Sequence, residues 1–192
     1  RNQMKGEAYF MRAFFYHEMA SFYGEVPLIV TTEAVNLPKA PAEEIYAQIA
    51  SDLKNAIQIM PSKAYSSISA GHATKWSAEA LMARVFLFYT GFYGKDALPL
   101  VGEDGTISGS VSKSEVVSWL EDCISNSGHE LVGDFRNLWS YTNRYTVEDY
   151  DFTKGQGLEW VENDNGVNPE TMFAIKFSNF PDWGTTIGYS NQ

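Results

Sequence analysis

The chain has 192 residues, of which 44% are hydrophobic and 20% charged, a balance that excludes intrinsic disorder and allows one sizeable core or two small ones. The net charge of −10 lies in the second half, because residues 1–96 carry 9 basic and 9 acidic side chains and residues 97–192 carry 5 and 15. An acidic surface repels phosphate backbones and anionic headgroups, which disfavours nucleic acid and electrostatic membrane binding and leaves neutral or cationic ligands possible.

Cysteine content and apolar runs exclude further classes. Cys123 is the only cysteine, so the chain has no internal disulfide and no metal site built from thiolates. No apolar run approaches the roughly 20 residues that span a bilayer, since the richest stretch, 78–89, contains Glu79 and Arg84. The sequence starts directly in a helical pattern, so we expect any signal or lipid anchor to lie upstream of Arg1.

Apolar side chains at steps of three and four predict a first α-helix of about 20 residues. The members of this stripe are Met4, Ala8, Met11, Phe15, Met19 and Phe22. Further aromatic residues widen the stripe, so we expect the helix to be sandwiched between neighbours. Gly24 ends the helix, Pro27 prevents its resumption, and residues 26–35 are expected to be extended.

Two more helices follow. The second begins near Pro41, stops at Pro61 and presents one apolar face. That face consists of Ile45, Ile49, Leu53 and Ile57. The third covers residues 73–89 or slightly more, carries Trp76 on a buried face and is apolar on nearly every side. A helix of that kind is expected at the centre of a bundle.

The second half is richer in loops. A glycine-rich loop at residues 94–109 precedes an amphipathic fourth helix that begins near Ser112, ends at Gly128 and buries Val116, Leu120 and Ile124. A short helical turn is expected at residues 134–141, and an extended segment at residues 172–178. We therefore predict an all-α helical-repeat scaffold of two degenerate hairpins in residues 1–128, with long loop insertions, followed by a loop-rich segment in residues 129–192.

Residues suited to catalysis or metal binding do not form a recognisable pattern. His17, His72 and His129 lie on different predicted elements without metal-binding spacing, which favours structural or surface roles. Residues 162–166 resemble a calcium loop, but the glycine falls too early for an EF-hand, which favours an acidic turn. Carboxylates such as Asp149 could serve glycoside hydrolysis only as a pair held at a defined separation in a cleft. We predict no catalytic residue, metal or cofactor.

Aromatic residues in the acidic loops are the more informative signal. Sugar rings pack a C–H face on a flat aromatic surface, while Asn, Asp and Arg bind the hydroxyls, so such loops suit neutral glycans. The candidate ligand-binding residues are Trp139, Tyr141, Tyr145 and Trp160. Packing in a small satellite core would explain the same residues nearly as well.

Several blocks resemble a known family. Residues 6–16 and 22–28 resemble the SusD/RagB signature, in which an aromatic-rich helix ends in a Tyr-Gly-acid-Val-Pro turn. The later blocks follow in the family's order: Glu44-Ile45-Tyr46 with Asp52-Leu53-Lys54-Asn55-Ala56-Ile57, Gly71-His72-Ala73-Thr74-Lys75 with Ala80-Leu81-Met82-Ala83-Arg84-Val85-Phe86-Leu87, Gly128-His129-Glu130-Leu131, Asn137-Leu138-Trp139, and Asn168-Pro169-Glu170-Thr171-Met172-Phe173-Ala174-Ile175. His72 departs from the family, which usually has Arg there, so an ion pair at this position would be absent or pH-dependent.

The resemblance implies a TPR-like scaffold wound as a right-handed α-superhelix and a surface-exposed outer-membrane lipoprotein of Bacteroidota, anchored through an upstream lipidated cysteine. It also implies a non-catalytic protein that holds an oligosaccharide over a SusC-like TonB-dependent transporter. Members are much longer, and a carboxy-terminal portion helps to form their glycan site. The alternatives are a helical-repeat scaffold that binds only protein, and a glycoside hydrolase.

Overall fold

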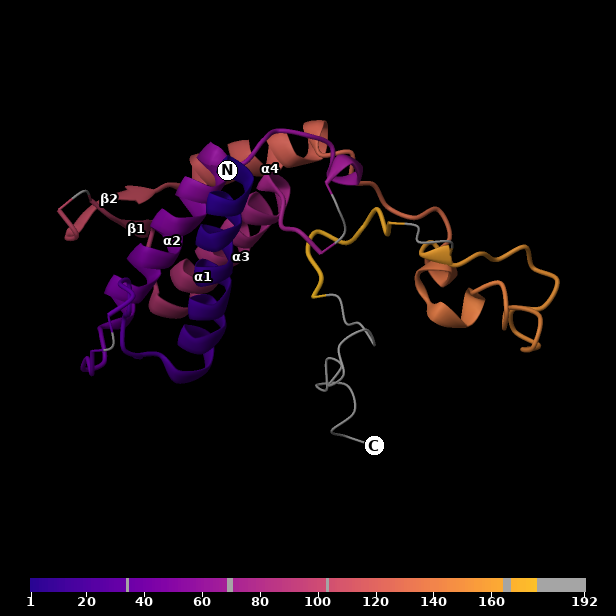
Figure 1. Ribbon diagram of the computed structural model, residues 1–192, viewed down its shortest axis with the longest axis horizontal. Helices are drawn as coiled ribbons and strands as arrows, with labels where there is room; N and C mark the ends of the chain where they lie inside the picture. Colours follow the sequence, from indigo (N-terminus) through magenta and orange to yellow (C-terminus); the bar gives the residue numbers. More distant parts are fainter. Residues whose placement is uncertain (34, 69–70, 103, 164–166, 176–192) are drawn as a thin grey trace.

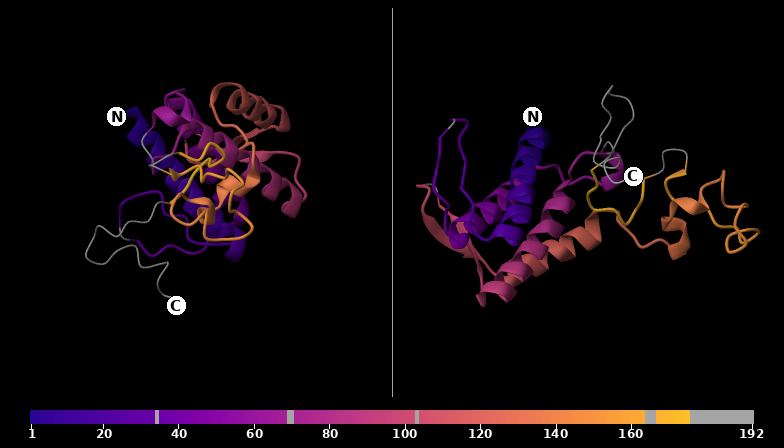
Figure 2. Two further views of the ribbon diagram at one scale, coloured as in Figure 1. Left: turned by 90° about the vertical axis from the view of Figure 1, so that its right-hand side faces the viewer. Right: turned by 90° about the horizontal axis from the view of Figure 1, so that it is seen from below.

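The computed structural model describes residues 1–33, 35–68, 71–102, 104–163 and 167–175. Their helices and strands follow in the order α1 (Asn2–Tyr23), α2 (Ala42–Ile59), α3 (Lys75–Tyr93), β1 (Leu98–Val101), β2 (Ile107–Val111) and α4 (Lys113–Asn126), with short 3₁₀ turns at Tyr65–Ser67, Phe135–Leu138 and Ser140–Thr142. Figure 1 shows the helices gathered in one body, from which residues 134–163, here called the loop lobe, project to one side. The view from below shows the same separation (Figure 2, right).

Helix α2 lies at the centre of the body and contacts α1, α3 and β1. It starts after Pro41, where a proline costs no hydrogen bond, and Glu43 and Glu44 in its first turn complement the positive helix end. The predicted apolar face of Ile45, Ile49, Leu53 and Ile57 is buried, as expected. Each such side chain contributes about 1.5–3 kcal/mol through burial, so α2 anchors the fold.

The bounds of α1 agree with the prediction, and Gly24 ends the helix with a φ of 70°. The predicted buried face is wrong, because most of that stripe is exposed, with Phe22 at 80%. The buried residues are Gly6, Phe10, Ala13, Tyr16, His17 and Ala20. A Cβ at Gly6 would collide with Met60, so this glycine lets α1 lie close to the C-terminal end of α2. One side of α1 therefore has no neighbour within the described residues, contrary to expectation.

Helix α3 occupies the predicted region and begins with a capping box formed by Thr74 and Ser77. Trp76 is 1% exposed, and its Nε1 donates to the Lys63 carbonyl over 2.7 Å. The helix packs between α2 and α4, which agrees with a central position. The expectation of burial on nearly every side is wrong for the face that carries Leu87, which is exposed.

A β-hairpin lies in the segment predicted as a glycine-rich loop. Strands β1 and β2 pair antiparallel, with Leu98 opposite Val111, and both of these side chains are fully buried. The Val101 amide donates to Ser51 Oγ of α2 over 2.8 Å, which fixes the hairpin to the body. Two strands of four and five residues that contain Pro99 and Gly109 lack a β signal, so the prediction of a loop is wrong here.

Helix α4 has the predicted bounds, since Ser112 and Glu115 form its capping box. Val116 is buried as predicted, but Ile124 is 79% exposed and Cys123 takes the buried position. Residues 116, 120 and 123 follow the helical period toward α3, and a step to 124 points away from it. The prediction for Ile124 is therefore wrong, although the helix is amphipathic.

After the loop lobe the chain returns to the body as a strap, residues 168–175 (Figure 1). The ring of Phe173 lies 4.9 Å from that of Phe10 between centroids, and Ser77 Oγ donates to the Met172 carbonyl. Residues 172–175 have no strand assignment, and the extended form of the segment predicted at 172–178 stays a prediction; residues 176–178 lie outside the described residues. Residues 164–166 of the predicted acidic turn also lie outside them.

Helix lengths bear on membrane association. Among the residues that the structure describes, no helix is both long enough and apolar enough to cross a membrane. The division into residues 1–128 and 129–192 stays a prediction, although all four named helices fall in the first part.

Candidate functional site

The loop lobe is ordered by hydrogen bonds rather than by helices or sheets. Thr142 is fully buried, and its Oγ1 donates to the Trp139 carbonyl over 2.7 Å. The Trp160 amide donates to the Thr142 carbonyl over 3.1 Å, and the Val161 amide donates to the Asn137 carbonyl over 3.0 Å. These bonds join the two 3₁₀ turns to residues about twenty positions later, so the lobe is a small folded unit that confirms the predicted turn at 134–141.

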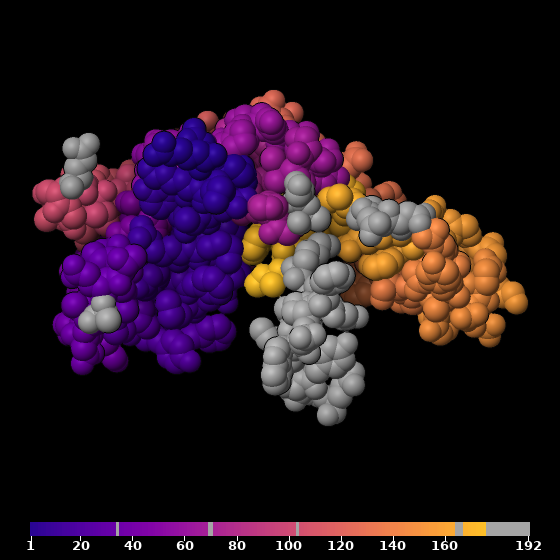
Figure 3. Space-filling model, in the orientation of Figure 1, coloured from indigo at the N-terminus to yellow at the C-terminus, as the bar shows by residue number. Residues whose placement is uncertain are grey.

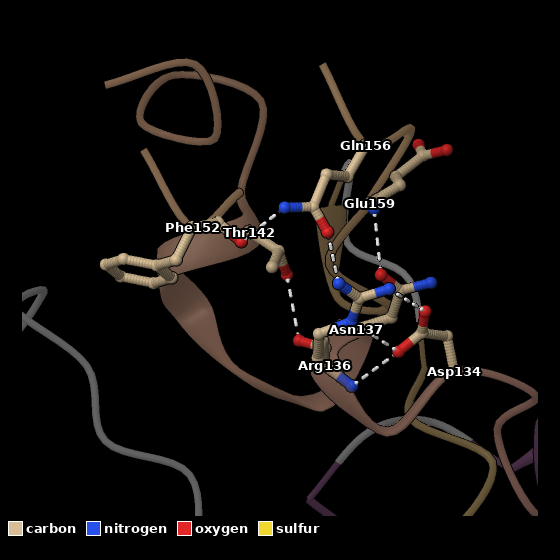
Figure 4. Close-up of polar contacts among 7 residues, drawn as sticks. All are labelled: Asp134, Arg136, Asn137, Thr142, Phe152, Gln156 and Glu159. Atoms are coloured by element: carbon tan, nitrogen blue, oxygen red, sulfur yellow. Dashed lines mark hydrogen bonds and ion pairs between the residues drawn. The ribbon is translucent and has the colours of Figure 1, made fainter. Parts of the chain in front are cut away.

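A polar clamp ties the ends of the lobe together (Figure 4). Arg136 Nη2 lies 2.7 Å from Asp134 Oδ2, and Arg136 Nη1 donates to Gln156 Oε1. Asn137 Oδ1 accepts from the Glu159 amide over 3.0 Å. The hydrogen bonds from Arg136 hold the pKa of the Asp134 carboxyl below its usual range. Arg136 therefore acts here as a positioning group, with its charge matched inside the lobe.

The four predicted ligand-binding residues all belong to the lobe but have different surroundings. Trp139 is 50% exposed and packs edge-on against Phe135, with centroids 6.0 Å apart. Tyr145 is 81% exposed, and the Arg144 guanidinium lies 5.3 Å from its ring centroid. Tyr141 and Trp160 are half-buried. Within the described residues no ring contact joins two of these four, so their role as one binding surface stays a prediction.

A tighter aromatic cluster was missed in the sequence. The rings of Tyr150 and Phe152 stack at 5.3 Å, and Phe152 meets Tyr141 edge-on at 5.4 Å. Both Tyr150 and Phe152 are exposed. Their i, i+2 spacing in an acidic loop has no periodic signal, and only Tyr141 was a candidate. An exposed pair of stacked rings offers a flat apolar surface of the kind on which sugars pack.

Charged groups between α3 and α4, outside the loop lobe, stabilise the fold. Lys75 Nζ lies 2.6 Å from Asp122 Oδ2 and 3.4 Å from Glu79 Oε1, which links α3 to α4. Glu79 is 0% exposed, and burial raises its pKa to about 7; Lys75 opposes this shift and Asp122 adds to it. This carboxyl is enclosed and cannot reach a substrate. Nowhere in the described ranges do three or more His, Cys, Asp or Glu residues lie in a group that could hold a metal ion.

The departure at His72 also has a structural counterpart. His72 Nδ1 lies 2.8 Å from Glu7 Oε1, and Gln3 Nε2 donates to the same oxygen over 2.6 Å. The contact is an ion pair only when His72 is protonated. The contact itself is present, and its pH dependence stays a prediction.

Comparison with known proteins agrees with this fold. Residues 1–87 match a SusD-like family model described as starch-binding and associating with the outer membrane. A SusD-like protein of Bacteroides ovatus is 26% identical over 159 residues, which cover 81% of this chain and 26% of the relative. A SusD superfamily structure from Bacteroides fragilis has a TM-score of 0.60 at 22% identity, covering 93% of this chain and 31% of that one. A structure solved with xylogluco-oligosaccharide has a TM-score of 0.62 at 21% identity, covering 95% and 30%.

The chain therefore spans about a third or less of the length of these relatives. Its helices and those of the structural neighbours confirm the predicted all-α, TPR-like fold, to which β1 and β2 add one small hairpin. The family model over residues 1–87 and the curated relatives agree in being SusD-like, and the chain is similar to proteins of the SusD/RagB family.

Proposed function

We propose that the protein captures soluble oligosaccharides at the cell surface without converting them and delivers them to a SusC-like TonB-dependent transporter. In this proposal it is an outer-membrane lipoprotein, held by a lipid anchor upstream of the residues considered. The matching family model is described as starch-binding and associating with the outer membrane, which supports a carbohydrate ligand and an outer-membrane location. The neighbour solved with xylogluco-oligosaccharide supports a glycan as the ligand.

The observation that carries the proposal is the set of exposed rings on the loop lobe. Trp139, Tyr145, Tyr150 and Phe152 are exposed although the lobe is cross-linked by the Arg136 clamp. Exposed rings on an ordered unit lose little conformational entropy when a ligand binds. Sugar hydroxyls exchange water for protein partners with little net gain, so we expect weak binding, with a Kd of roughly 1 μM to 1 mM.

Calorimetry with a panel of neutral oligosaccharides from starch and xyloglucan tests the proposal. We expect Trp139→Ala and Phe152→Ala to weaken binding by about five- to tenfold, because each removes a stacking surface worth about 1 kcal/mol. Phe22→Ala is the control, since Phe22 is also an exposed aromatic residue but lies on α1, away from the lobe. If neither lobe variant weakens a glycan that the wild type binds, the lobe is not the site. Release of reducing sugar would contradict a non-catalytic role.

A second candidate is a scaffold that binds protein alone. The exposed apolar residues of α1 and α3, among them Phe15, Phe22, Leu87 and Phe92, favour it, because clusters of this kind often mark protein contacts. Co-purification of the chain with a transporter, together with no heat of binding for any glycan in the panel, would select this candidate. Glycan binding that responds to Trp139 would select the first.

A further inference from the structure

A hollow lies between the strap and helices α1 and α3, outside the loop lobe. Its walls come from α1 through Phe10 and Phe14, from α3 through Leu81 and Arg84, and from residues 170–173 of the strap. Its volume is about 450 Å³, within the usual size of small-ligand pockets. The space-filling view shows the strap, in yellow, against the indigo and violet atoms of α1 (Figure 3).

Partly exposed aromatic rings line this hollow. Phe10 is almost fully buried and forms the floor, while Phe14 and Phe173 are only partly buried. The rings of Phe14 and Phe173 meet edge to face with centroids 5.6 Å apart, and each ring is only partly buried. Both rings therefore keep apolar surface that a ligand ring can use, as the exposed rings of the lobe do.

Arg84 places a positive charge on the same wall. It is exposed and has no hydrogen bond or ion pair within the part of the chain that the structure describes. Arg12 and Arg136, by contrast, each bind a carboxylate within 2.7 Å. Glu170 also lines the hollow, and its Oε1 accepts from the Val132 amide over 2.7 Å.

The positive charge of Arg84 also acts on a neighbouring histidine. Burial lowers the pKa of His17 on α1, Glu18 opposes this shift, and the positive charge of Arg84 adds to it. A guanidinium binds a carboxylate through two parallel hydrogen bonds, which no neutral sugar supplies.

We infer that this hollow binds an acidic sugar residue of a glycan, with the sugar carboxylate on Arg84 and the sugar ring against Phe14 and Phe173. The inference rests on the proposed glycan-binding function but uses a site apart from the lobe aromatics. The hollow thus favours acidic sugars over neutral ones, and the lobe supplies a stacking surface for neutral sugars. Arg84 is the residue that decides specificity.

Calorimetry with trigalacturonate and its fully methyl-esterified form tests the inference, because the two ligands share a shape and differ in charge. We expect wild type to bind the acid about tenfold more tightly than the ester, since a hydrogen bond to a charged group is worth about 1.5 kcal/mol or more. Arg84→Gln should abolish this difference, and Arg84→Lys should keep part of it. Lys95→Gln is the control, because it removes the same charge from an exposed site just beyond the C-terminal end of α3.

The outcomes separate this inference from the proposed function. Loss of the acid preference in Arg84→Gln alone supports it, whether or not Trp139→Ala affects neutral glycans. Equal affinity for the acid and the ester, an unchanged preference in Arg84→Gln, an equal loss in Lys95→Gln, or no binding of trigalacturonate would each overturn it. If the inference is overturned but neutral glycans still bind through the lobe, the proposed function holds. Circular dichroism of the exposed Arg84 variants confirms that they fold.

Discussion

The helical body and the loop lobe reach order in opposite ways. The body buries apolar residues between helices, and side chains such as Ile45 and Leu53 are inaccessible to solvent. The lobe leaves Trp139 and Phe152 exposed and relies on bonds between side chains and backbone, such as that from Thr142 to Trp139. Burial is worth more than a net hydrogen bond of about 1 kcal/mol, so stability resides in the body. The lobe can present rings to solvent because its fold does not depend on burying them.

The largest expected effect is on the body. We expect Trp76→Ala to lower the free energy of unfolding by about 3–5 kcal/mol, because it empties a buried site and removes the hydrogen bond to the Lys63 carbonyl. Chemical denaturation measures this change. Trp139→Ala is the matched variant in the lobe and should cost about 1 kcal/mol or less, since half of that side chain is already in water. Similar losses of unfolding free energy in the two variants would contradict the conclusion that stability resides in the body.

The buried carboxyl between α3 and α4 should make the body sensitive to pH. The pKa of Glu79 is raised from its ordinary value of 4.5 to about 7, so its protonated form favours folding. This stability is fully present below pH 4.5 and is lost as pH rises through 7, to the extent of about 3 kcal/mol. Denaturation of wild type between pH 4.5 and pH 9 should show the decline, and Glu79→Gln should remove most of it.

The lobe offers a control for that pH dependence. Arg136 holds the pKa of Asp134 below 3.8, so Asp134 stays ionised over the whole window and Asp134→Asn should leave the slope unchanged. A wild-type stability that is constant from pH 4.5 to pH 9 would contradict the assignment of Glu79 as a proton-binding group.

The end of α1 tests the contribution of backbone conformation alone. Gly24 has a φ of 70° and open space around its Cβ position, so Gly24→Val should cost about 1–2 kcal/mol through strain without a clash. Gly91→Ala is the matched change within α3, also in open space but at a helical φ, and should stabilise by about 0.5–1 kcal/mol. Thermal melts distinguish the two, and a wild-type melting temperature in Gly24→Val would argue against the cap.

Sequence alone located the helices because their boundaries are local. Pro41, Gly24, Ser112 and Gly128 each start or end a helix through the chemistry of one or two residues. The buried face of α1 is not local. Two apolar stripes compete on that helix, and the choice between them depends on Gly6, where only the absent side chain allows contact with Met60 of the neighbouring segment.

The candidate site was predictable only in part for the same reason. Aromatic composition pointed to the lobe, and all four candidates lie in it. The stacking of Tyr150 on Phe152 and the bond from Arg136 to Gln156 depend on how an irregular loop folds back, which no period of two or 3.6 encodes. The hollow at Arg84 needs contact between residues more than eighty positions apart, so the sequence did not suggest it.

The smallest expected effect concerns salt, and it sharpens the contrast between the two regions. A neutral oligosaccharide on the lobe replaces no counterions, so its affinity at low and high ionic strength should agree within about threefold. Arg136 in the lobe is paired with Asp134, so this part of the lobe has little net charge for salt to screen. Trigalacturonate in the hollow should instead weaken as salt rises, because an exposed guanidinium and a carboxylate attract each other across a screened distance. Titrating one neutral and one acidic oligosaccharide at about 20 mM and 500 mM salt, where the screening length falls several-fold, measures both slopes in one protein. Equal slopes would mean that the two regions do not divide stacking and charge recognition between them.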